Sequence, residues 1–385
     1  MNKINDYRIA WLLPSLSRGV YWQPVLSEFT KRFNQTTIYT GDWSDFTPGF
    51  EGSFSVEVVG QTKFVKTELS QVGYSSGFSY VSPKIVSHLL NYKPHVIFAH
   101  SFSVWTLLAV LFKPLGGWKL IIAYDGSSPI IDRRNSKLHL LYRRIIVQMA
   151  DALITNSQGG KDYLTEVLGA RENSVFAQPY QVPNPKALLG QVEEAKLNLP
   201  QLQHPIFMFS GVVQVRKGLR FLLEACNILQ RQGYQNYTLL IVGDGPQGKE
   251  LKEFVKNQDL SDRVYWAGWV EYGKLGNYFH QADVFVFSTL EDIWGMVVLE
   301  AMAFGKPILC SKWAGVAEMV MEGENGYIFD PHNPQELAEL MQRFLKNSTQ
   351  IRSMGNKSQQ LIAPHTPESV AEFLEEVTSF ALGIS

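Results

Sequence analysis

The sequence predicts an α/β protein made of two Rossmann-like domains, each with a doubly wound parallel sheet. Three observations support this fold class. Short apolar runs alternate with helical patterns, the runs are nearly continuous in Val, Ile, Leu and Phe, and a proline-rich gap separates them into two groups. A chain of 385 residues is also longer than a typical single domain, so two domains are expected.

The first domain is predicted to cover residues 1–183. Its strands are expected at Arg8–Leu13, Thr37–Thr40, His95–His100, Lys119–Tyr124, Ala152–Thr155 and Ser174–Ala177. Residues 60–83 show no clear apolar period, and we interpret them as a long loop.

The second domain is predicted to cover residues 206–367, after a linker at 184–205. The stretch 178–205 holds five prolines and no strand signal, which is typical of a domain boundary. A C-terminal helix is expected within 368–385. The strands of this domain are expected at Ile206–Ser210, Leu239–Val242, Val264–Trp266, Val284–Ser288 and Pro307–Cys310.

The charge of the chain is nearly balanced overall but unevenly distributed. The formal net charge is −1, which gives no gross signature of nucleic-acid binding. Residues 1–180 hold 18 Lys and Arg against 13 Asp and Glu, and the remainder holds 17 against 23. The two cysteines are far apart, which fits a reducing compartment. We therefore expect a cytoplasmic protein without a signal peptide.

The stretch 287-FSTLEDIWGMVVLEAMAFGKPILCS-311 predicts a strand, a turn and a helix with two acids eight positions apart. The amides of Gly295, Met296 and Val297 would open the helix, where the partial positive charge suits a phosphate. Asp292 and Glu300 would then accept hydrogen bonds from sugar hydroxyls. The alternative is that Asp292 caps the helix and Glu300 complements the dipole in its first turn.

Two cations, Arg216 and Lys217, follow the strand at Ile206–Ser210 in a short loop. They would neutralise a diphosphate, or they would be solvated surface charges. The Gly-x-Gly at Gly243 and Gly245 is a weak dinucleotide signal, because no acid follows about 20 positions later.

In the first half, His100 lies at the carboxyl end of a predicted strand. It would donate to a sugar hydroxyl or transfer a proton, or it would be a structural strand-end residue. Gly19, in the turn after the first strand, would allow a ligand to approach its backbone. Residues 132–149 are interpreted as one basic amphipathic helix that either lies on an anionic membrane or packs on the sheet.

Together these segments resemble family 4 of the glycosyltransferases, retaining enzymes with the GT-B fold. The resemblance is strong from about Phe207 to Pro334 and weaker from Arg8 to Pro183. It is carried by GVVQVRKGLRFLLEA, LLIVGDGP, VYWAGWV, ADVFVFSTLEDIWGMVVLEAMAFGKPIL and AEMVMEGENGYIFDP. It implies two domains facing a central cleft, the first for the acceptor and the second for a sugar nucleotide, with helix 368–385 packed back on the first.

The resemblance also implies roles for the residues singled out above. Glu300 would hold the ribose hydroxyls and Asp292 would face the transferred sugar. The turn at Gly295, Met296 and Val297 would bind the phosphates, and Arg216 and Lys217 would neutralise the leaving diphosphate. Val270 would contact the base, Gly19 would allow the ligand to approach closely, and His100 would contact the donor sugar.

Two positions depart from the family pattern. The first acid of the family pair is Asp292 here, one methylene shorter, with Glu291 beside it as a substitute. The Arg that usually follows the loop glycine is Val212, and Arg216 would supply that charge.

The sequence thus predicts a metal-independent, cofactor-free hexosyltransferase that uses a UDP-sugar, with UDP-glucose preferred. The expected acceptor is a saccharide or a lipid-linked saccharide in polysaccharide biosynthesis, with peripheral contact to the inner membrane face through 132–149. Two alternatives stay open on the same fold: a catalytically silent sugar-nucleotide-binding protein, and a sugar-nucleotide epimerase or hydrolase. A nicotinamide dehydrogenase is disfavoured by the missing acid.

Overall fold

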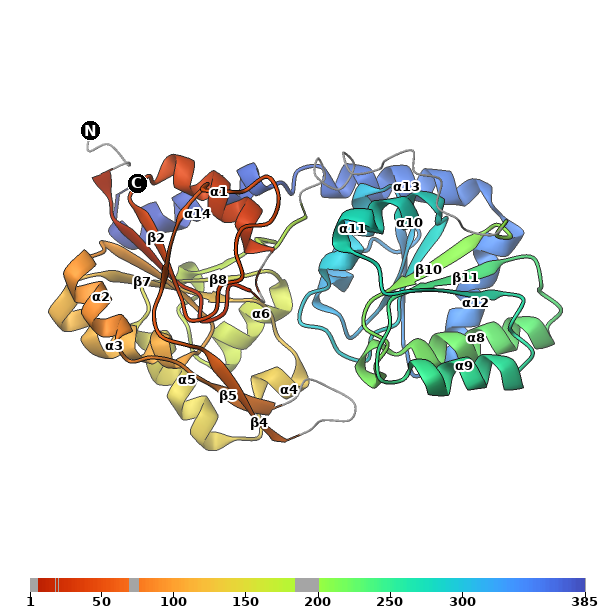
Figure 1. Cartoon of the computed structure of the whole chain (residues 1–385), viewed down its shortest axis with the longest axis horizontal. Helices are drawn as coiled ribbons and strands as arrows, with labels where there is room; N and C mark the ends of the chain where they lie inside the picture. Colours follow the sequence, from red (N-terminus) through yellow and green to blue (C-terminus); the bar gives the residue numbers. More distant parts are fainter. Residues whose placement is uncertain (1–5, 18, 20, 69–75, 184–200, 385) are drawn as a thin grey trace. The chain divides into compact units, whose positions relative to one another are not determined.

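The chain forms two compact units, each built around its own sheet (Figure 1). The structure is a computed structural model that describes residues 6–17, 19, 21–68, 76–183 and 201–384. Unit 1 comprises the chain up to Val182 together with the segment from His365, and unit 2 runs from Pro183 to Pro364. Residues 184–200 of the predicted linker lie outside the described residues, and 201–205 lead into the first strand of unit 2 without helix or strand.

Unit 1 has a parallel sheet whose described strands follow the order β3-β2-β1-β6-β7-β8-β9. Nearly every residue of the central strands is buried because helices cover both faces. The strands are β1 (Ile9–Leu12), β2 (Thr36–Thr40), β3 (Ser55–Val58), β6 (Val96–His100), β7 (Lys119–Tyr124), β8 (Ala152–Thr155) and β9 (Val175–Ala177).

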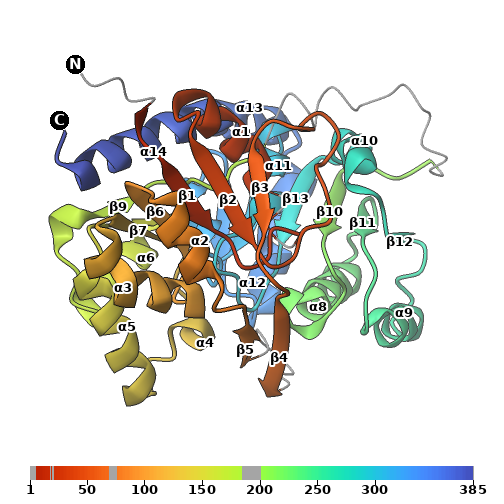
Figure 2. The same cartoon turned by 60° about the vertical axis from the view of Figure 1, so that its left-hand side comes forward.

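The helices of unit 1 cover the two faces of this sheet in separate groups. One face packs against α1 (Trp22–Arg32) and α14 (Pro367–Leu382). The other face packs against α2 (Ile85–Tyr92), α3 (Val104–Gly116) and α5 (Lys137–Met149), which Figure 2 shows together. The shorter elements are α4 (Pro129–Asp132), α6 (Gln158–Asp162), the π-helical turn η2 (Tyr163–Val167) and the 3₁₀ turn η3 (Glu172–Ser174).

Unit 2 has a second parallel sheet, with described strands in the order β12-β11-β10-β13-β14-β15. This strand order and the one in unit 1 confirm the predicted fold class of two Rossmann-like parallel sheets. The strands are β10 (Ile206–Ser210), β11 (Thr238–Val242), β12 (Val264–Gly268), β13 (Val284–Phe287), β14 (Ile308–Ser311) and β15 (Gly326–Phe329).

The helices of unit 2 follow the apolar periodicity of the sequence. In α8 (Leu219–Arg231) the buried residues Leu222, Leu223, Cys226 and Leu229 form one stripe against the sheet. The other elements are η4 (Val215–Lys217), α9 (Gly248–Asn257), η5 (Tyr272–Lys274), α10 (Leu275–Gln281), α11 (Met296–Ala303), η6 (Gly315–Met319), α12 (Pro334–Lys346) and α13 (Thr349–Ile362).

Three sequence-based interpretations are wrong in detail. Residues 60–83 are not one long loop, because β4 (Lys63–Glu68) and β5 (Ser76–Tyr80) pair there as an antiparallel ribbon. The segment 132–149 is not one helix. It breaks at Arg133, which takes a left-handed conformation after α4, and α5 begins only at Lys137.

The third error is that two strands were missed, β3 and β15. The strand β3 lies at a sheet edge and is partly exposed, so its sequence SVEV lacks a buried strand's apolar run. The strand β15 begins at Gly326, where a Cβ would lie 1.9 Å from the carbonyl oxygen of Ile308. The close approach of β14 therefore requires glycine in a strand, a residue that weakens the sequence signal.

The last helix of the chain, α14, belongs to unit 1. Thr366 and Ser369 form a capping box at its start, and Pro367 occupies the first turn. Its residues Val370, Leu374 and Val377 are buried in the same cluster as Phe29 of α1. At the rim, Arg32 of α1 forms ion pairs with Glu372 at 2.8 Å and Glu375 at 2.5 Å.

No helix in the described part of the chain is both long and apolar enough to cross a membrane.

Replacing Leu374 by Ala should lower the free energy of unfolding by about 2–5 kcal/mol, because the cavity lies under α14 in the core of unit 1. Urea unfolding followed by tryptophan fluorescence measures this change. The matched control is Glu376→Ala on the exposed side of the same helix, which should change the stability by no more than about 0.5 kcal/mol. Equal stability of the wild type and Leu374→Ala would show that α14 does not support unit 1.

Candidate functional site

The residues predicted to bind a donor gather at the carboxyl ends of two neighbouring strands of unit 2. Strands β10 and β13 are paired in the sheet. The loop after β10 carries Arg216 and Lys217, and the loop after β13 carries Glu291 and Asp292. Ligands of open α/β sheets bind beyond the carboxyl ends of the strands.

Backbone contacts hold these two loops together. The amide of Leu290 donates to the carbonyl of Arg216 at 2.7 Å, and the hydroxyl of Ser288 donates to the carbonyl of Lys217 at 3.1 Å. Gly218 ends η4 with φ +66, and a Cβ there would lie 1.9 Å from the carbonyl oxygen of Ser288. Glycine is therefore required where the first loop crosses the second.

The side chains of Arg216, Lys217 and Asp292 form one ion cluster. Asp292 Oδ2 accepts from Lys217 Nζ at 2.6 Å and from Arg216 Nη1 at 3.0 Å. All three side chains are at most 15% exposed. Burial opposes ionisation of Asp292, but the two cations outweigh it and lower the pKa of the carboxyl. The cluster carries two positive charges against one negative charge, so it retains an excess positive charge for an anion.

Glu291 differs from Asp292 in how it meets the cations. Its backbone carbonyl accepts from Arg216 Nη1 at 2.7 Å and from the hydroxyl of Thr289 at 2.9 Å. Its side chain is buried. Asp292 is thus the acid whose carboxylate contacts both cations. Val212 is half exposed, in the same loop as Arg216.

Helix α11 begins beside this cluster with a backbone that only glycine tolerates. Gly295 is the N-cap, with φ +124, and a Cβ would lie 2.8 Å from Val316 Cγ1 and 2.9 Å from Phe287 Cε1. No side chain caps the helix, so the capping role considered for Asp292 is not its role here. The first amides of a helix have no acceptor within it, and Gly295, Met296 and Val297 provide such amides.

Glu300 lies inside α11 and is buried among apolar side chains. It is the fifth residue of the helix, so the first-turn dipole role considered for it is also excluded. Tyr272 of η5 donates its hydroxyl to Glu300 Oε1 at 2.9 Å. Burial raises the pKa of Glu300 to about 7, although the Tyr272 hydrogen bond acts in the opposite direction. A carboxylate in such a place gains most from a ligand that brings hydroxyl donors.

Three further predicted residues of unit 2 pack on an apolar cluster. Val270, Met296 and Val297 are partly buried and contact the cluster that also contains Leu299 and Met302. All the predicted donor residues except Gly19 therefore lie in unit 2.

Gly19 and His100 lie in unit 1. Gly19 is buried between β1 and α1, and a Cβ there would lie 3.1 Å from Trp22 Cδ1. Its amide donates to Leu16 O at 2.9 Å. Packing against Trp22 explains why residue 19 is glycine without reference to any ligand.

His100 belongs to a buried polar network at the ends of β6, β7 and β9. Its Nε2 is 2.9 Å from Asp125 Oδ2, and Tyr180 donates its hydroxyl to Asp125 Oδ1 at 2.8 Å. Asn156 donates to the carbonyl of Asp125 and accepts from the amides of Tyr180 and Gln181. Burial opposes protonation of His100, but the charge and the hydrogen bond of Asp125 outweigh it and raise the pKa of His100. Burial also opposes ionisation of Asp125, whose pKa His100 lowers.

Asp125 and Tyr180 were missed by the sequence analysis. Asp125 directly follows the predicted strand Lys119–Tyr124, so the criterion that selected His100 applies equally to Asp125. Tyr180 lies in the proline-rich stretch that we interpreted only as a boundary.

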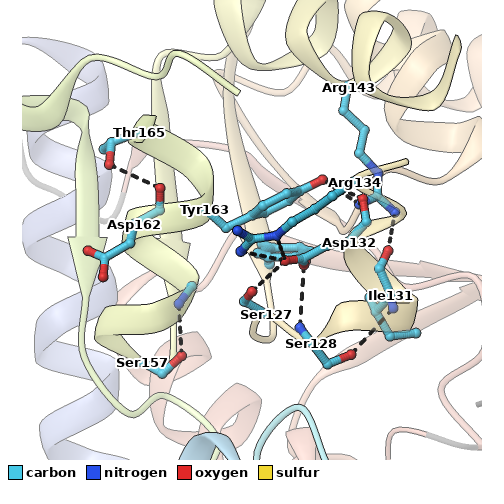
Figure 3. Close-up of polar contacts among 12 residues, drawn as sticks. Ser127, Ser128, Ile131, Asp132, Arg134, Arg143, Ser157, Asp162, Tyr163 and Thr165 are labelled. Carbon is cyan, nitrogen blue, oxygen red and sulfur yellow. Dashed lines mark hydrogen bonds and ion pairs between the residues drawn. The ribbon is translucent and has the colours of Figure 1, made fainter. Parts of the chain in front are cut away.

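A second polar network lies beside the first, around α4 (Figure 3). Asp132 is fully buried and accepts from Tyr124 Oη at 2.7 Å and from Ser127 Oγ at 2.6 Å. Arg134 Nε donates to Asp132 Oδ2 at 3.0 Å. Arg143 of α5 donates to the carbonyls of Ile131 and Asp132.

A protein of Haemophilus influenzae described as an uncharacterized glycosyltransferase is 24% identical over 325 residues, which cover 78% of this chain and 87% of that protein. A sulfoquinovosyl transferase of Arabidopsis thaliana is 22% identical over 310 residues, which cover 77% of this chain and 58% of that protein. The chain thus spans most of the first relative and just over half of the second.

Two solved structures resemble the whole chain. A glycosyltransferase of Rickettsia africae superposes with a TM-score of 0.76 at 15% identity, covering 100% of both chains. Anabaena HepE in complex with UDP gives a TM-score of 0.73 at 18% identity, covering 97% of this chain and 99% of that one.

The fold is GT-B, the two-domain architecture of one class of glycosyltransferases, as the resemblance implied. Residues 192–361, which cover most of unit 2, match the family model described as "Glycosyl transferases group 1".

Replacing Glu300 by Gln should stabilise the ligand-free protein at neutral and alkaline pH. The folded-state pKa of about 7 lies above the usual glutamate pKa of 4.5, so the stability contributed by the protonated acid is complete below about pH 4.5 and is lost as the pH rises through about 7. Urea unfolding at about pH 8 should show Glu300→Gln more stable than the wild type by a few kcal/mol, on the order of 3. The difference should vanish near pH 4.5, and a difference independent of pH would refute the buried-acid assignment.

Replacing Asp125 by Asn should lower the pKa of His100, because the neutral amide leaves only the effect of burial. Proton NMR of the histidine ring signals over a pH titration measures the shift, with the His100 signal assigned from a His100→Gln variant. His95, which does not contact Asp125, is the internal control, and its pKa should not change. An unchanged pKa of His100 would show that Asp125 does not hold it in the charged form.

Proposed function

We propose that the protein is a retaining glycosyltransferase that moves a hexose from a UDP-sugar, with UDP-glucose preferred, to a saccharide or lipid-linked saccharide. The observation that carries this proposal is the ion cluster of Arg216, Lys217 and Asp292, which joins the loop after β10 to the loop before α11 in the same unit as the buried Glu300. The UDP and UDP-glucose complexes of Anabaena HepE support the choice of donor by analogy of fold.

The proposed reaction breaks the bond between the anomeric carbon and the β-phosphate oxygen. The acceptor oxygen forms its new bond on the same face of the sugar, and the acceptor proton passes to the departing phosphate oxygen. Negative charge grows on the diphosphate during this step, so fixed cations lower the barrier. Arg216, Lys217 and the first amides of α11 would supply that stabilisation.

The binding roles follow from the surroundings of each residue. Glu300, with its raised pKa, would accept hydrogen bonds from the ribose hydroxyls, and these donors would stabilise its charged form. Val270 would pack against the base, since it is a partly buried apolar residue that contacts the apolar cluster containing Leu299 and Met302. Asp292 would orient the two cations and face the transferred sugar, with Glu291 as the neighbouring acid.

From unit 1 we propose His100, held by Asp125, as the group that acts on the sugar or the acceptor. The network around Asp125 fixes the ring, since Tyr180 occupies the second carboxylate oxygen. We also propose that the basic segment 132–149 contacts the inner face of a membrane, where polysaccharide precursors with lipid anchors are found.

Removing the Glu300 carboxylate should weaken donor binding by about tenfold or more, because two charge-assisted hydrogen bonds are lost. Calorimetry with UDP-glucose on Glu300→Ala measures the affinity. Glu253→Ala, an exposed acid on α9, is the control and should bind like the wild type. A thermal-shift series with UDP, ADP and GDP sugars identifies the donor, because a tight ligand raises Tm by mass action.

Lys217→Ala should lower the rate of sugar transfer by about 10²–10³-fold, because one hydrogen-bond donor to the transition state is lost. Lys256→Ala on α9 should not change this rate.

The alternative functions predict other outcomes when binding and consumption of the donor are measured. Steady consumption of the donor without an acceptor would favour an epimerase or hydrolase. Tight binding with no turnover would favour a silent sugar-nucleotide-binding protein, and unchanged affinity of Glu300→Ala for every nucleotide sugar would refute the site.

A further inference from the structure

Large apolar side chains are exposed along the outer surfaces of α3 and α5. On α5 they recur at Leu138, Leu141, Ile145 and Met149, and on α3 at Val104, Leu111 and Leu115, with exposures between 41% and 76%. Spacings of three and four residues on α5, and of seven and four on α3, place each set on one face of its helix. This face is the opposite of the buried one, which contains Ile146 and Val147 on α5 and Trp105 and Ala109 on α3.

The two stripes belong to one surface. Helices α3 and α5 lie in the same layer over one face of the unit 1 sheet (Figure 2). Tyr142 of α5 donates to the carbonyl of Phe102 just before α3 at 3.2 Å, and Lys113 of α3 donates to the carbonyl of Met149 at 2.7 Å. Neighbouring helices of one layer direct their outer faces to the same side of the molecule. We call this surface the α3–α5 face, defined by the seven residues above.

The orientation of α5 is fixed by the polar network around Asp132 (Figure 3). Arg143, on the inner side of α5, donates to the Ile131 carbonyl at 2.8 Å and to the Tyr163 hydroxyl at 2.8 Å. Tyr163 donates to the Asp132 carbonyl at 2.8 Å. Because these contacts hold the inner side of the helix, the stripe at Leu138, Leu141 and Ile145 cannot rotate inward without breaking them.

The segment that carries the α3–α5 face has more cations than acids. Residues 101–151 contain seven Lys and Arg against three Asp, a formal charge of +4. The three acids are committed to contacts within unit 1, Asp125 to His100, Asp132 to the network of Figure 3 and Asp151 to Lys113 and Lys119. Lys137 and Arg144 are exposed on α5, next in sequence to residues of the apolar stripe, and Arg144 also donates to the carbonyl of Val167 at 2.9 Å.

We propose that the α3–α5 face docks on an anionic lipid bilayer, with its leucines inserted at the interface and Lys137 and Arg144 near the headgroup phosphates. Exposed leucines beside exposed cations match the two components of such a surface, apolar chains and negative charge. This inference deepens the membrane contact proposed above and names its residues, which extend beyond 132–149 to α3.

Charge favours a bilayer over a second copy of the chain. A symmetric dimer through this face would bring the cations of one copy toward those of the other, which opposes association. An anionic membrane instead compensates each cation, which increases the affinity roughly fivefold per basic residue near the surface.

Vesicle flotation tests the proposal with the full chain and without any sugar nucleotide, so its result is independent of the proposed reaction. The wild type should float with vesicles of phosphatidylcholine and phosphatidylglycerol in equal parts, and much less with phosphatidylcholine alone. The triple variant Leu138→Ser, Leu141→Ser, Ile145→Ser should bind the anionic vesicles at least about tenfold more weakly, because three inserted side chains are removed. Lys137→Glu should weaken binding and reduce its dependence on salt.

Two matched variants control for loss of fold and for general charge. Val58→Ser removes an exposed apolar side chain elsewhere on unit 1, and Lys256→Glu changes an exposed charge on unit 2. Both should float like the wild type, and all variants should keep the wild-type circular dichroism and Tm. Failure of the wild type to bind anionic vesicles would overturn the proposal. Equal binding of the triple variant, or a concentration-dependent dimer that the triple variant abolishes without vesicle binding, would overturn it too.

Discussion

The shared carboxylate oxygen of Asp292 is the contact on which the arrangement of unit 2 depends. Through Oδ2 it binds Arg216 and Lys217, and so joins the loop after β10 to the loop after β13. Without this anion, two cations with little exposure would repel each other at close range. With it, the two cations are held in place without a ligand, so a diphosphate bound as we propose would meet positive groups that are already oriented.

Unit 1 uses the same principle with a different chemistry. One carboxylate oxygen of Asp125 contacts His100, and the other accepts from the Tyr180 hydroxyl. Asn156 donates to the backbone carbonyl of Asp125 and accepts from the backbone amide of Tyr180. In each unit a carboxylate that follows a parallel strand contacts the ionisable groups of the proposed site. The parallel sheets bring these groups together because all their strands end at one edge.

Much of the fold was predictable from the sequence, because parallel strands covered on both faces leave unbroken apolar runs. Every predicted strand is present, with ends that differ by no more than two residues. The strands that were missed are those whose residues do not follow this rule, namely the exposed edge strand β3, the ribbon of β4 and β5, and β15 with its required Gly326. The site was predictable in part, since motif position selected Arg216, Lys217, Asp292 and Glu300. The partners of these residues were not, because contacts such as Tyr272 with Glu300 join positions far apart in the sequence.

The place of α14 has a consequence for the order in which the protein acquires its structure. The helix contributes Val370, Leu374 and Val377 to the core around β1 and β6, yet it is synthesised after the whole of unit 2. Domains of a nascent chain generally fold from the N-terminus as they emerge from the ribosome. Here unit 1 leaves the ribosome with part of one apolar face uncovered until α14, which follows unit 2 in the sequence, has been synthesised. The second half, whose segments are contiguous, has all its core residues before then, so it is the half able to fold first.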